Sequence, residues 1–288
     1  MRLVTIRETL GEHAGVERGG KVFSLARTQF GRGWRMLDIL AEGPSALPMI
    51  RAAMESADEA AWTPLAEVTL LAPIPRPAKN IFCIGRNYAE HAAESLRAIG
   101  QEVKLPPAPN VFTKAPTSVI GPEAAIPFDP ELSAQMDWEA ELGVVIGVAG
   151  RHIPEADALA HVFGYTIIND VSARDVQHRP GMQWFLGKSF DGSCPMGPAI
   201  VTADEISDPQ RLAISLTVNG ITKQQDTTAS MLFSVAAIIA DLSRYLTLEP
   251  GDIIATGTPA GVGFGRTPPE FLVPGDVVEA SIEGIGTL

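Results

Sequence analysis

Residues 137–147 read DWEAELGVVIG, an apolar run with two glutamates, Glu139 and Glu141, near its start. In a β-strand, side chains two positions apart point to the same face. The two carboxylates should therefore lie side by side, with Ala140 and Leu142 on the opposite face. Such a pair is unfavourable unless one carboxylate is protonated, water surrounds both, or a cation lies between them. The stretch predicts an inner strand with a charged site at one end.

A third acidic residue, Asp170, ends the apolar segment GYTIIND at 164–170. Glu139, Glu141 and Asp170 would form a ligand set made of oxygen atoms alone, which suits Mg²⁺, Mn²⁺ or Ca²⁺ and argues against zinc. On spacing alone, an exposed edge strand with two glutamates remains the alternative.

The composition excludes several classes of protein. The chain has 288 residues, 45% of them hydrophobic, and a formal net charge of −12 without a run of Lys or Arg, which excludes nucleic acid and anionic membranes as partners. The longest apolar run, at 231–242, is too short to cross a bilayer, and the N-terminal residues lack the apolar core of a signal peptide. We therefore expect a cytoplasmic protein. Cys83 and Cys194 lack metal-ligand spacing and are expected to be buried free thiols.

The organisation of the chain follows from its 27 glycines and 23 prolines, which favour many short strands and turns. A proline cluster at Pro73, Pro75 and Pro77 reads as a linker, so we expect a small N-terminal α/β domain over 1–72 and a catalytic domain over 73–288. The fold class is α+β, mainly β.

Three local patterns predict single elements. Asn219-Gly220 between alternating residues predicts a β-hairpin. Apolar residues at helical spacing over 230–248 predict a core helix with Ser230 as its N-cap. Residues 155–162, EADALAHV, predict a short helix.

Five segments together resemble one known family. They are FCIGRNYAEHAAE (82–94), DWEAELGVVIG (137–147), NDVSARDVQ (169–177), WFLGKSFDGSCPMGP (184–198) and GDIIATGTPAGVG (251–263). In this order and spacing they closely resemble the fumarylacetoacetate hydrolase (FAH) superfamily, over about residues 75–288. The resemblance implies a mixed β-sandwich roll with a small N-terminal domain in front of it, and a homodimer.

The resemblance also implies a metal site. The family's E-x-E pair and later Asp match Glu139, Glu141 and Asp170, so a divalent cation would lie between the carboxylates. The eukaryotic fumarylacetoacetases supply a further metal-binding Asp two residues before the Tyr that matches Tyr88, whereas this chain has Arg86 there. Water or substrate oxygens would complete the coordination, as in the prokaryotic-type branch, and Mg²⁺ or Mn²⁺ is favoured over Ca²⁺.

Three residues are candidates for catalysis. His91 and Glu94 are three residues apart and would share one face of a helical turn, where the carboxylate can orient the imidazole. In acylpyruvase-like members of the family the matching pair activates water, and a solvated helix face is the alternative. Lys188 follows an apolar stretch and should meet an anion; in the family the matching Lys approaches a substrate oxygen.

Four further residues are candidates for substrate binding. Arg86 would lie near the mouth of the site and attract an anion, with a structural ion pair as the alternative. Tyr88, Gln177 and Thr258 match family positions at the substrate site. Arg174 and Asp175 are expected to form a supporting ion pair. The remaining histidines are interpreted as surface or core residues: His13, His152, His161 and His178.

The chemistry that fits is built around a 2-oxo acid that binds the metal through two oxygens and develops an enolate at C3. The leading prediction is hydrolysis of the C–C bond of a 2,4-dioxo acid of the acylpyruvate type. Loss of CO₂ from oxaloacetate, or isomerisation of a 2-oxo acid by reprotonation of C3, would use the same enolate and stays open as the alternative. A protein that binds the metal for structure alone is the third reading.

Overall fold

The structure is a computed structural model that describes residues 1–8, 11–28, 34–181 and 183–288. In the described parts, twelve strands form one mixed sheet. Their order is β4 (Trp62–Pro64), β3 (Lys21–Ser24), β2 (Gly11–Arg18), β1 (Arg2–Glu8), β13 (Cys194–Thr202), β11 (Val162–Asn169), β10 (Ala140–Ile146), β16 (Ile253–Ala255), β6 (Ile81–Gly85) and β7 (Asn110–Lys114), with β5 (Thr69–Leu71) beside β1 and β8 (Val119–Ile120) beside β13.

Two smaller sheets complete the β structure of the described residues. They contain β15 (Ile221–Thr227), β14 (Ala213–Val218), β17 (Val278–Ile282) and β18 (Gly286–Thr287) in one sheet, and β12 (Ser172–Ala173) and β9 (Met136–Asp137) in the other.

Helices are the minority, which confirms the α+β, mainly β class. The α-helices are α1 (Met36–Glu42), α2 (Ala46–Glu55), α3 (Ala89–Ala98), α4 (Arg174–Gln177), α5 (Phe185–Lys188) and α6 (Val235–Tyr245). The 3₁₀ helices are η1 (Leu25–Arg27), η2 (Gly43–Ser45), η3 (Glu59–Ala61), η4 (Leu65–Glu67), η5 (Pro116–Ser118), η6 (Glu155–His161), η7 (Ala203–Glu205), η8 (Thr228–Ser230) and η9 (Gly263–Gly265). The helix predicted over 155–162 is thus of the 3₁₀ type.

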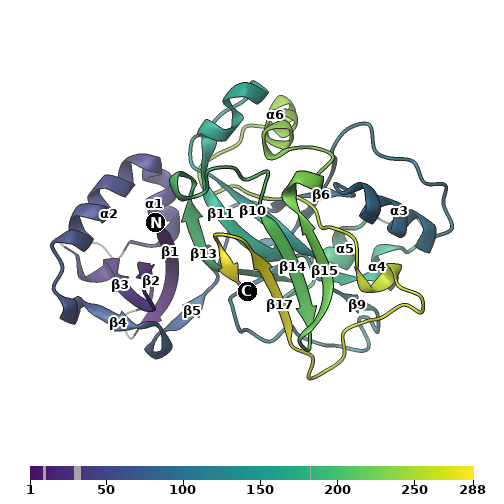
Figure 1. The fold of residues 1–288 in the computed structure, drawn as a ribbon, viewed down its shortest axis with the longest axis horizontal. Helices are drawn as coiled ribbons and strands as arrows, with labels where there is room; N and C mark the ends of the chain where they lie inside the picture. Colours follow the sequence, from purple (N-terminus) through teal and green to yellow (C-terminus); the bar gives the residue numbers. More distant parts are fainter. Residues whose placement is uncertain (9–10, 29–33, 182) are drawn as a thin grey trace.

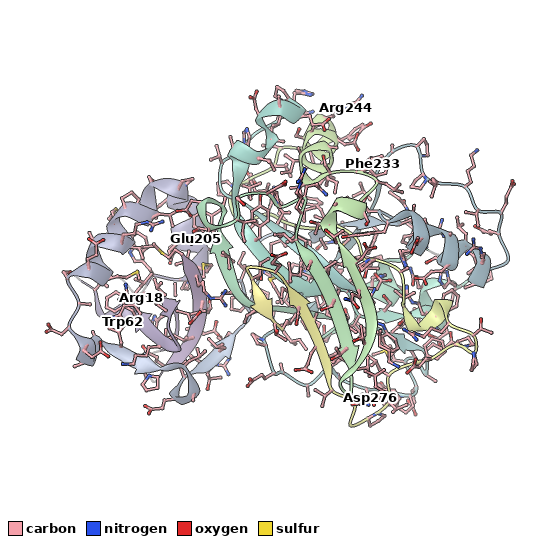
Figure 2. The ribbon with its side chains drawn as sticks, viewed as in Figure 1. Arg18, Trp62, Glu205, Phe233, Arg244 and Asp276 are labelled. Atoms are coloured by element: carbon pink, nitrogen blue, oxygen red, sulfur yellow. The ribbon has the colours of Figure 1, made fainter. Side chains whose placement is uncertain are left out.

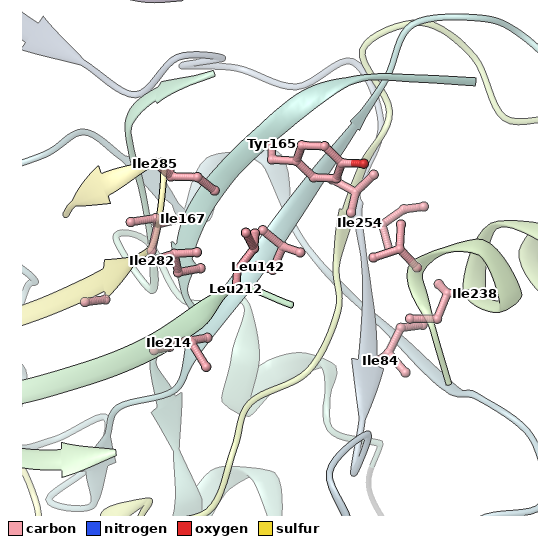
Figure 3. Packing of buried hydrophobic residues seen from close by; sticks show 14 of the residues in the cluster. Ile84, Leu142, Tyr165, Ile167, Leu212, Ile214, Ile238, Ile254, Ile282 and Ile285 are labelled. Atoms are coloured by element: carbon pink, nitrogen blue, oxygen red, sulfur yellow. The ribbon is translucent and has the colours of Figure 1, made fainter. Parts of the chain in front are cut away.

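The four-stranded sheet packs on the large sheet. Leu142 of β10 and Ile167 of β11 belong to one buried cluster with Ile214 of β14 and Ile282 of β17 (Figure 3). Ala140 lies in the same cluster, so the predicted alternation along this strand is confirmed. The opposite face of β10 is the one that carries the two glutamates.

The N-terminal residues join the same large sheet. β1 pairs with β13, with Leu3 opposite Ile200, and α1 and α2 lie beside the N-terminal strands at the left of the view (Figure 1). Ile39 and Ile50 of those helices share a buried cluster with Val145 of β10. The division into domains at 72/73 stays a prediction, and the sheet and its core run across it.

The core helix begins four residues later than predicted. Ser234 is the N-cap of α6, and its side chain accepts a hydrogen bond from the Ala237 amide at 3.1 Å. Ser230 donates to Asp226 instead. Residues 231–233 are not helical, and the amides of Leu232 and Phe233 donate instead to the backbone carbonyl and the side chain of Asn87.

Other local predictions are confirmed. Asn219 and Gly220 join β14 to β15 in a hairpin, both with positive φ (52° and 74°), as the type I′ turn requires. Cys83 and Cys194 are buried free thiols. The described part of the chain contains no helix that is long and apolar enough to span a membrane.

Candidate active site

The ends of four strands of the large sheet meet at one place. Glu139 precedes β10, and Asp170 follows β11; because these strands are antiparallel, with Ala140 opposite Asn169, the two acids become neighbours. Gly257 lies just after β16, which also pairs with β10. Arg86 follows β6, which runs parallel to β16. The sheet topology thus gathers residues that are far apart in the sequence.

Glu139, Glu141 and Asp170 form a buried cluster. One ligand atom from each lies within 4.8 Å of the others, and at most 4% of any of the three residues is exposed. The Lys188 ammonium lies 2.7 Å from Glu139 Oε2 and 2.8 Å from Asp170 Oδ2. The expectation that Lys188 meets an anion is therefore confirmed. Although burial opposes its charge, Asp170 and Glu139 raise the pKa of Lys188.

Two further buried cations complete the cluster. The Lys114 ammonium lies 2.7 Å from Asp170 Oδ1 and also donates to the backbone carbonyl of Lys188. Arg174 pairs with Asp137 at 2.8 Å and with Glu139 at 2.6 Å. The predicted pair of Arg174 with Asp175 is wrong, because the exposed Asp175 accepts a hydrogen bond from Ser133 while Arg174 turns inward to two buried carboxylates.

Lys114 is a site residue that the sequence analysis missed. The available signal was a lysine in NVFTK (110–114), at the end of a short strand and just before the turn at 115–118. A lysine buried at such a position requires an anionic partner.

His91 and Glu94 share one face of α3, as predicted. His91 Nδ1 lies 3.0 Å from Glu94 Oε1, and the Gly261 amide donates to the same carboxylate. A carboxylate that accepts Nδ1–H leaves Nε2 as the free proton acceptor. Ser95 Oγ is 3.5 Å from that nitrogen.

One cavity brings most of the predicted residues together. Its lining includes Glu139, Glu141, His91, Lys188, Arg86, Gln177 and Thr258, together with Arg174, Ser95, Phe112, His178, Trp184 and Phe264. Glu94 and Asp170 lie directly behind lining residues. Tyr88 does not line the cavity: it is 1% exposed, and burial, Asp226 and Glu141 raise the pKa of its hydroxyl.

The cavity has a buried inner end and a half-buried outer rim. At the inner end the side-chain oxygen of Gln177 accepts a hydrogen bond from Arg174, so the Gln177 amide NH₂ can donate to a ligand. The Thr258 hydroxyl at the same end accepts a hydrogen bond from Gln224. The outer rim includes Arg86 and His178. His178 is thus a cavity residue and not the surface or core residue that the sequence suggested.

The geometry agrees with the comparison to protein families. The sequence model of the family described as "Fumarylacetoacetate (FAA) hydrolase C-terminal" matches residues 80–288. The chain belongs to the fumarylacetoacetate hydrolase family. The resemblance in the five motifs is thereby confirmed.

Two curated members of the FAH family illustrate the relationship. The oxaloacetate tautomerase of Bacillus subtilis (strain 168) is 50% identical over 224 residues, which cover 78% of this chain and 73% of that protein. The mitochondrial oxaloacetate tautomerase of Rattus norvegicus is 44% identical over 292 residues, which cover 100% of this chain and 90% of that protein.

Two solved structures share the FAH fold. A fumarylacetoacetate hydrolase from Exiguobacterium antarcticum has a TM-score of 0.83 and 40% identity, covering 100% of this chain and 97% of that chain. A maleylpyruvate hydrolase from Sphingobium sp. SYK-6, solved with manganese(II) and pyruvate, has a TM-score of 0.79 and 28% identity with the same coverage.

The carboxylate cluster of this FAH member fits a hard divalent cation. Burial, and the charges of Asp170 and Glu139, raise the pKa of Glu141, which has no ion pair in the described part of the chain. It accepts a hydrogen bond from the Gly257 amide at 2.8 Å. With Glu141 ionised, the buried cluster would set four carboxylates (Asp137, Glu139, Glu141, Asp170) against three cations (Lys114, Arg174, Lys188), one more carboxylate than the ion pairs use. A divalent cation would reverse the resulting negative charge and suit an anionic substrate.

Proposed function

We propose that this FAH-family enzyme is a Mg²⁺- or Mn²⁺-dependent tautomerase of a 2-oxo acid of the oxaloacetate type. The observation that carries the proposal is the placement of His91, backed by Glu94, and of Lys188 around one cavity beside three carboxylates grouped closely enough to hold a metal ion. Relatives 44% and 50% identical are oxaloacetate tautomerases. They favour the isomerase alternative over the hydrolysis that the sequence analysis placed first.

The reaction moves one proton within the substrate. The C3–H bond of the keto form breaks, a C2=C3 double bond forms, and the C2 oxygen gains a proton to give the enol; the molecular formula does not change. A bound divalent cation supplies Lewis-acid polarisation of substrate oxygens. The protein must supply a base for the C3 proton and hold the charge on the C2 oxygen.

His91 is suited to carry the proton. Glu94 orients the imidazole through Nδ1, so that Nε2 is free to accept and return a proton at C3. The pair that the sequence assigned to water activation can thus serve isomerisation without water. The buried Lys188 ammonium can donate to the C2 oxygen as charge develops there. Gln177, Thr258 and the Arg174 side chain line the same inner end and can hold the C1 carboxylate.

Hydrolysis of a 2,4-dioxo acid is the second candidate. It is favoured by the fold shared with a maleylpyruvate hydrolase solved with pyruvate and manganese(II). In that reaction His91 would deprotonate water instead of C3.

The experiment follows three reactions of the Mn²⁺-loaded protein in parallel: the enol absorbance of oxaloacetate, pyruvate release from oxaloacetate, and acetylpyruvate hydrolysis. We expect rapid equilibration of the enol with the keto form, without pyruvate release. His91→Ala should slow it by about 10²–10⁴-fold, the range for losing a general base. His161→Ala, outside the cavity, is the matched control.

The three readouts separate the candidates. If acetylpyruvate is hydrolysed faster than oxaloacetate tautomerises, the enzyme is the hydrolase of the sequence prediction. If pyruvate forms from oxaloacetate at the rate of enol loss, it is a decarboxylase. Tautomerisation by His91→Ala at the wild-type rate would remove His91 from the mechanism.

A further inference from the structure

The outer rim of the cavity contains a cation without an acidic partner. Lys188 and Arg174 are each paired with two carboxylates. Arg86, by contrast, has no carboxylate within ion-pair distance in the part of the chain that the structure describes. Burial lowers the pKa of this guanidinium, so its charge is held there at a cost in free energy. An anion bound at the rim would offset that cost.

Arg86 is held in place by its backbone and by an aromatic ring. Its φ is +59°, in the left-handed region that few residues other than glycine adopt. Its guanidinium lies 5.4 Å from the centre of the Trp184 ring, which in turn packs edge-on against Phe112 at 5.5 Å. The cation is therefore preorganised and does not depend on a flexible surface side chain.

His178 provides a second, neutral donor on the same rim. Its ring stacks on Phe264 with centroids 5.0 Å apart and planes at 25°, and the Phe264 amide is fixed by Asp137 at 3.0 Å. Burial, and the charges of Arg174, Arg86 and Lys188, lower the pKa of His178 to about 4. The imidazole is thus neutral, with one N–H to donate.

From this geometry we infer that Arg86 and His178 form a subsite for a second carboxylate, the one at C4 of a four-carbon 2-oxo dicarboxylic acid. The inference rests on the proposed function, because it requires the 2-oxo carboxylate end of the substrate to bind the metal and Lys188 at the inner end of the cavity. The distal carboxylate would then face the outer rim, where it meets the unpaired guanidinium and the imidazole N–H. These two residues would make the site selective for oxaloacetate over 2-oxo acids with an apolar end.

The test compares two ligands of equal length. Oxaloacetate and 2-oxobutyrate both have four carbons and a 2-oxo carboxylate end, and they differ in a carboxylate against a methyl at C4. Binding to the Mn²⁺-loaded protein is measured by calorimetry at low temperature. We expect the wild type to favour oxaloacetate by about ten- to a hundredfold, the range for one or two charge-assisted hydrogen bonds.

Three variants locate the preference. His178→Phe keeps a ring on Phe264 and removes the N–H, while Arg86→Gln removes the charge; each should lower the affinity ratio by about tenfold. His178→Gln, which restores a donor, should recover part of it. Arg244→Gln removes an equivalent charge on α6 (Figure 2), outside the cavity lining, and should leave the ratio unchanged.

The outcomes distinguish this inference from the function beneath it. If neither acid binds the loaded protein, the proposed function fails and the subsite fails with it. If both bind with similar affinity, or if His178→Phe and Arg86→Gln keep the wild-type ratio, the subsite alone is overturned.

Discussion

At the scale of single residues, Lys114 shows how charge is balanced inside this protein. It is fully buried, pairs with Asp170, and donates to the backbone carbonyls of Val171 and Lys188. One ammonium group therefore balances the charge of Asp170 and also fixes the backbone of the segment that carries Lys188. Removing it would leave Asp170 with Lys188 as its remaining cation.

Lys114→Met should destabilise the protein by about 3 kcal/mol or more, because breaking a buried pair leaves an undercompensated charge. The measurement is the free energy of unfolding in urea. Lys21→Met, which breaks an exposed pair with Glu59, is the matched control and should lower the free energy of unfolding far less, because water screens that pair. Equal losses in the two variants would refute the role given to Lys114.

At the scale of elements, the start of α6 is set by Asn87, which lies far away in the sequence. Its side chain bridges the carbonyls of Phe233 and Thr256 and holds the Phe233 amide. The same contacts tie α6 to the strand end that supplies Gly257. α6 begins directly after this anchored segment, with Ser234 as its N-cap.

Ser234→Ala should lower the free energy of unfolding by about 1 kcal/mol, the usual effect of losing an N-cap. Ser230→Ala alters an exposed hydrogen bond and should change it by less than about 0.5 kcal/mol. Urea unfolding of both variants checks the prediction. A larger loss at Ser230 would favour the helix start expected from the sequence.

At the scale of the whole molecule, the buried carboxylate cluster joins the ends of strands from one sheet. Glu139 directly precedes β10, Glu141 lies near its start, and Asp170 directly follows β11. A cation bound by all three would bind the folded chain and not the unfolded one, and so would stabilise the fold as a whole. Assembly into a homodimer, which the family resemblance implies, stays a prediction.

Mn²⁺ or Mg²⁺ should raise the melting temperature, and EDTA should reverse the effect. At a concentration one hundred times the dissociation constant, the gain is about 2.7 kcal/mol. Glu141→Gln should abolish the dependence on metal while the protein still unfolds cooperatively. A melting temperature that ignores millimolar Mn²⁺, or a Glu141→Gln protein with the full shift, would contradict a metal site at this cluster.

The sequence by itself determined what depends on local periodicity and residue chemistry. Alternation placed Glu139 and Glu141 on one face, helical spacing paired His91 with Glu94, and Asn219-Gly220 made the hairpin. These features depend on residues a few positions apart, whose relative geometry the backbone fixes. That Lys188 needs an anionic partner followed from residue chemistry, because burying an unpaired ammonium group in an apolar stretch is costly in free energy.

Only the tertiary structure decided which distant groups meet. Lys114 and Asp170 are 56 residues apart, and Arg174 pairs with Asp137 and Glu139 and not with its neighbour Asp175. The stacking of His178 on Phe264 joins residues far apart in the chain, so no local sequence pattern predicts it. Such contacts arise because antiparallel and parallel pairing brings the ends of β10, β11, β16 and β6 to one edge of the sheet. That register is set by the packing of the whole core, which no short window of sequence contains.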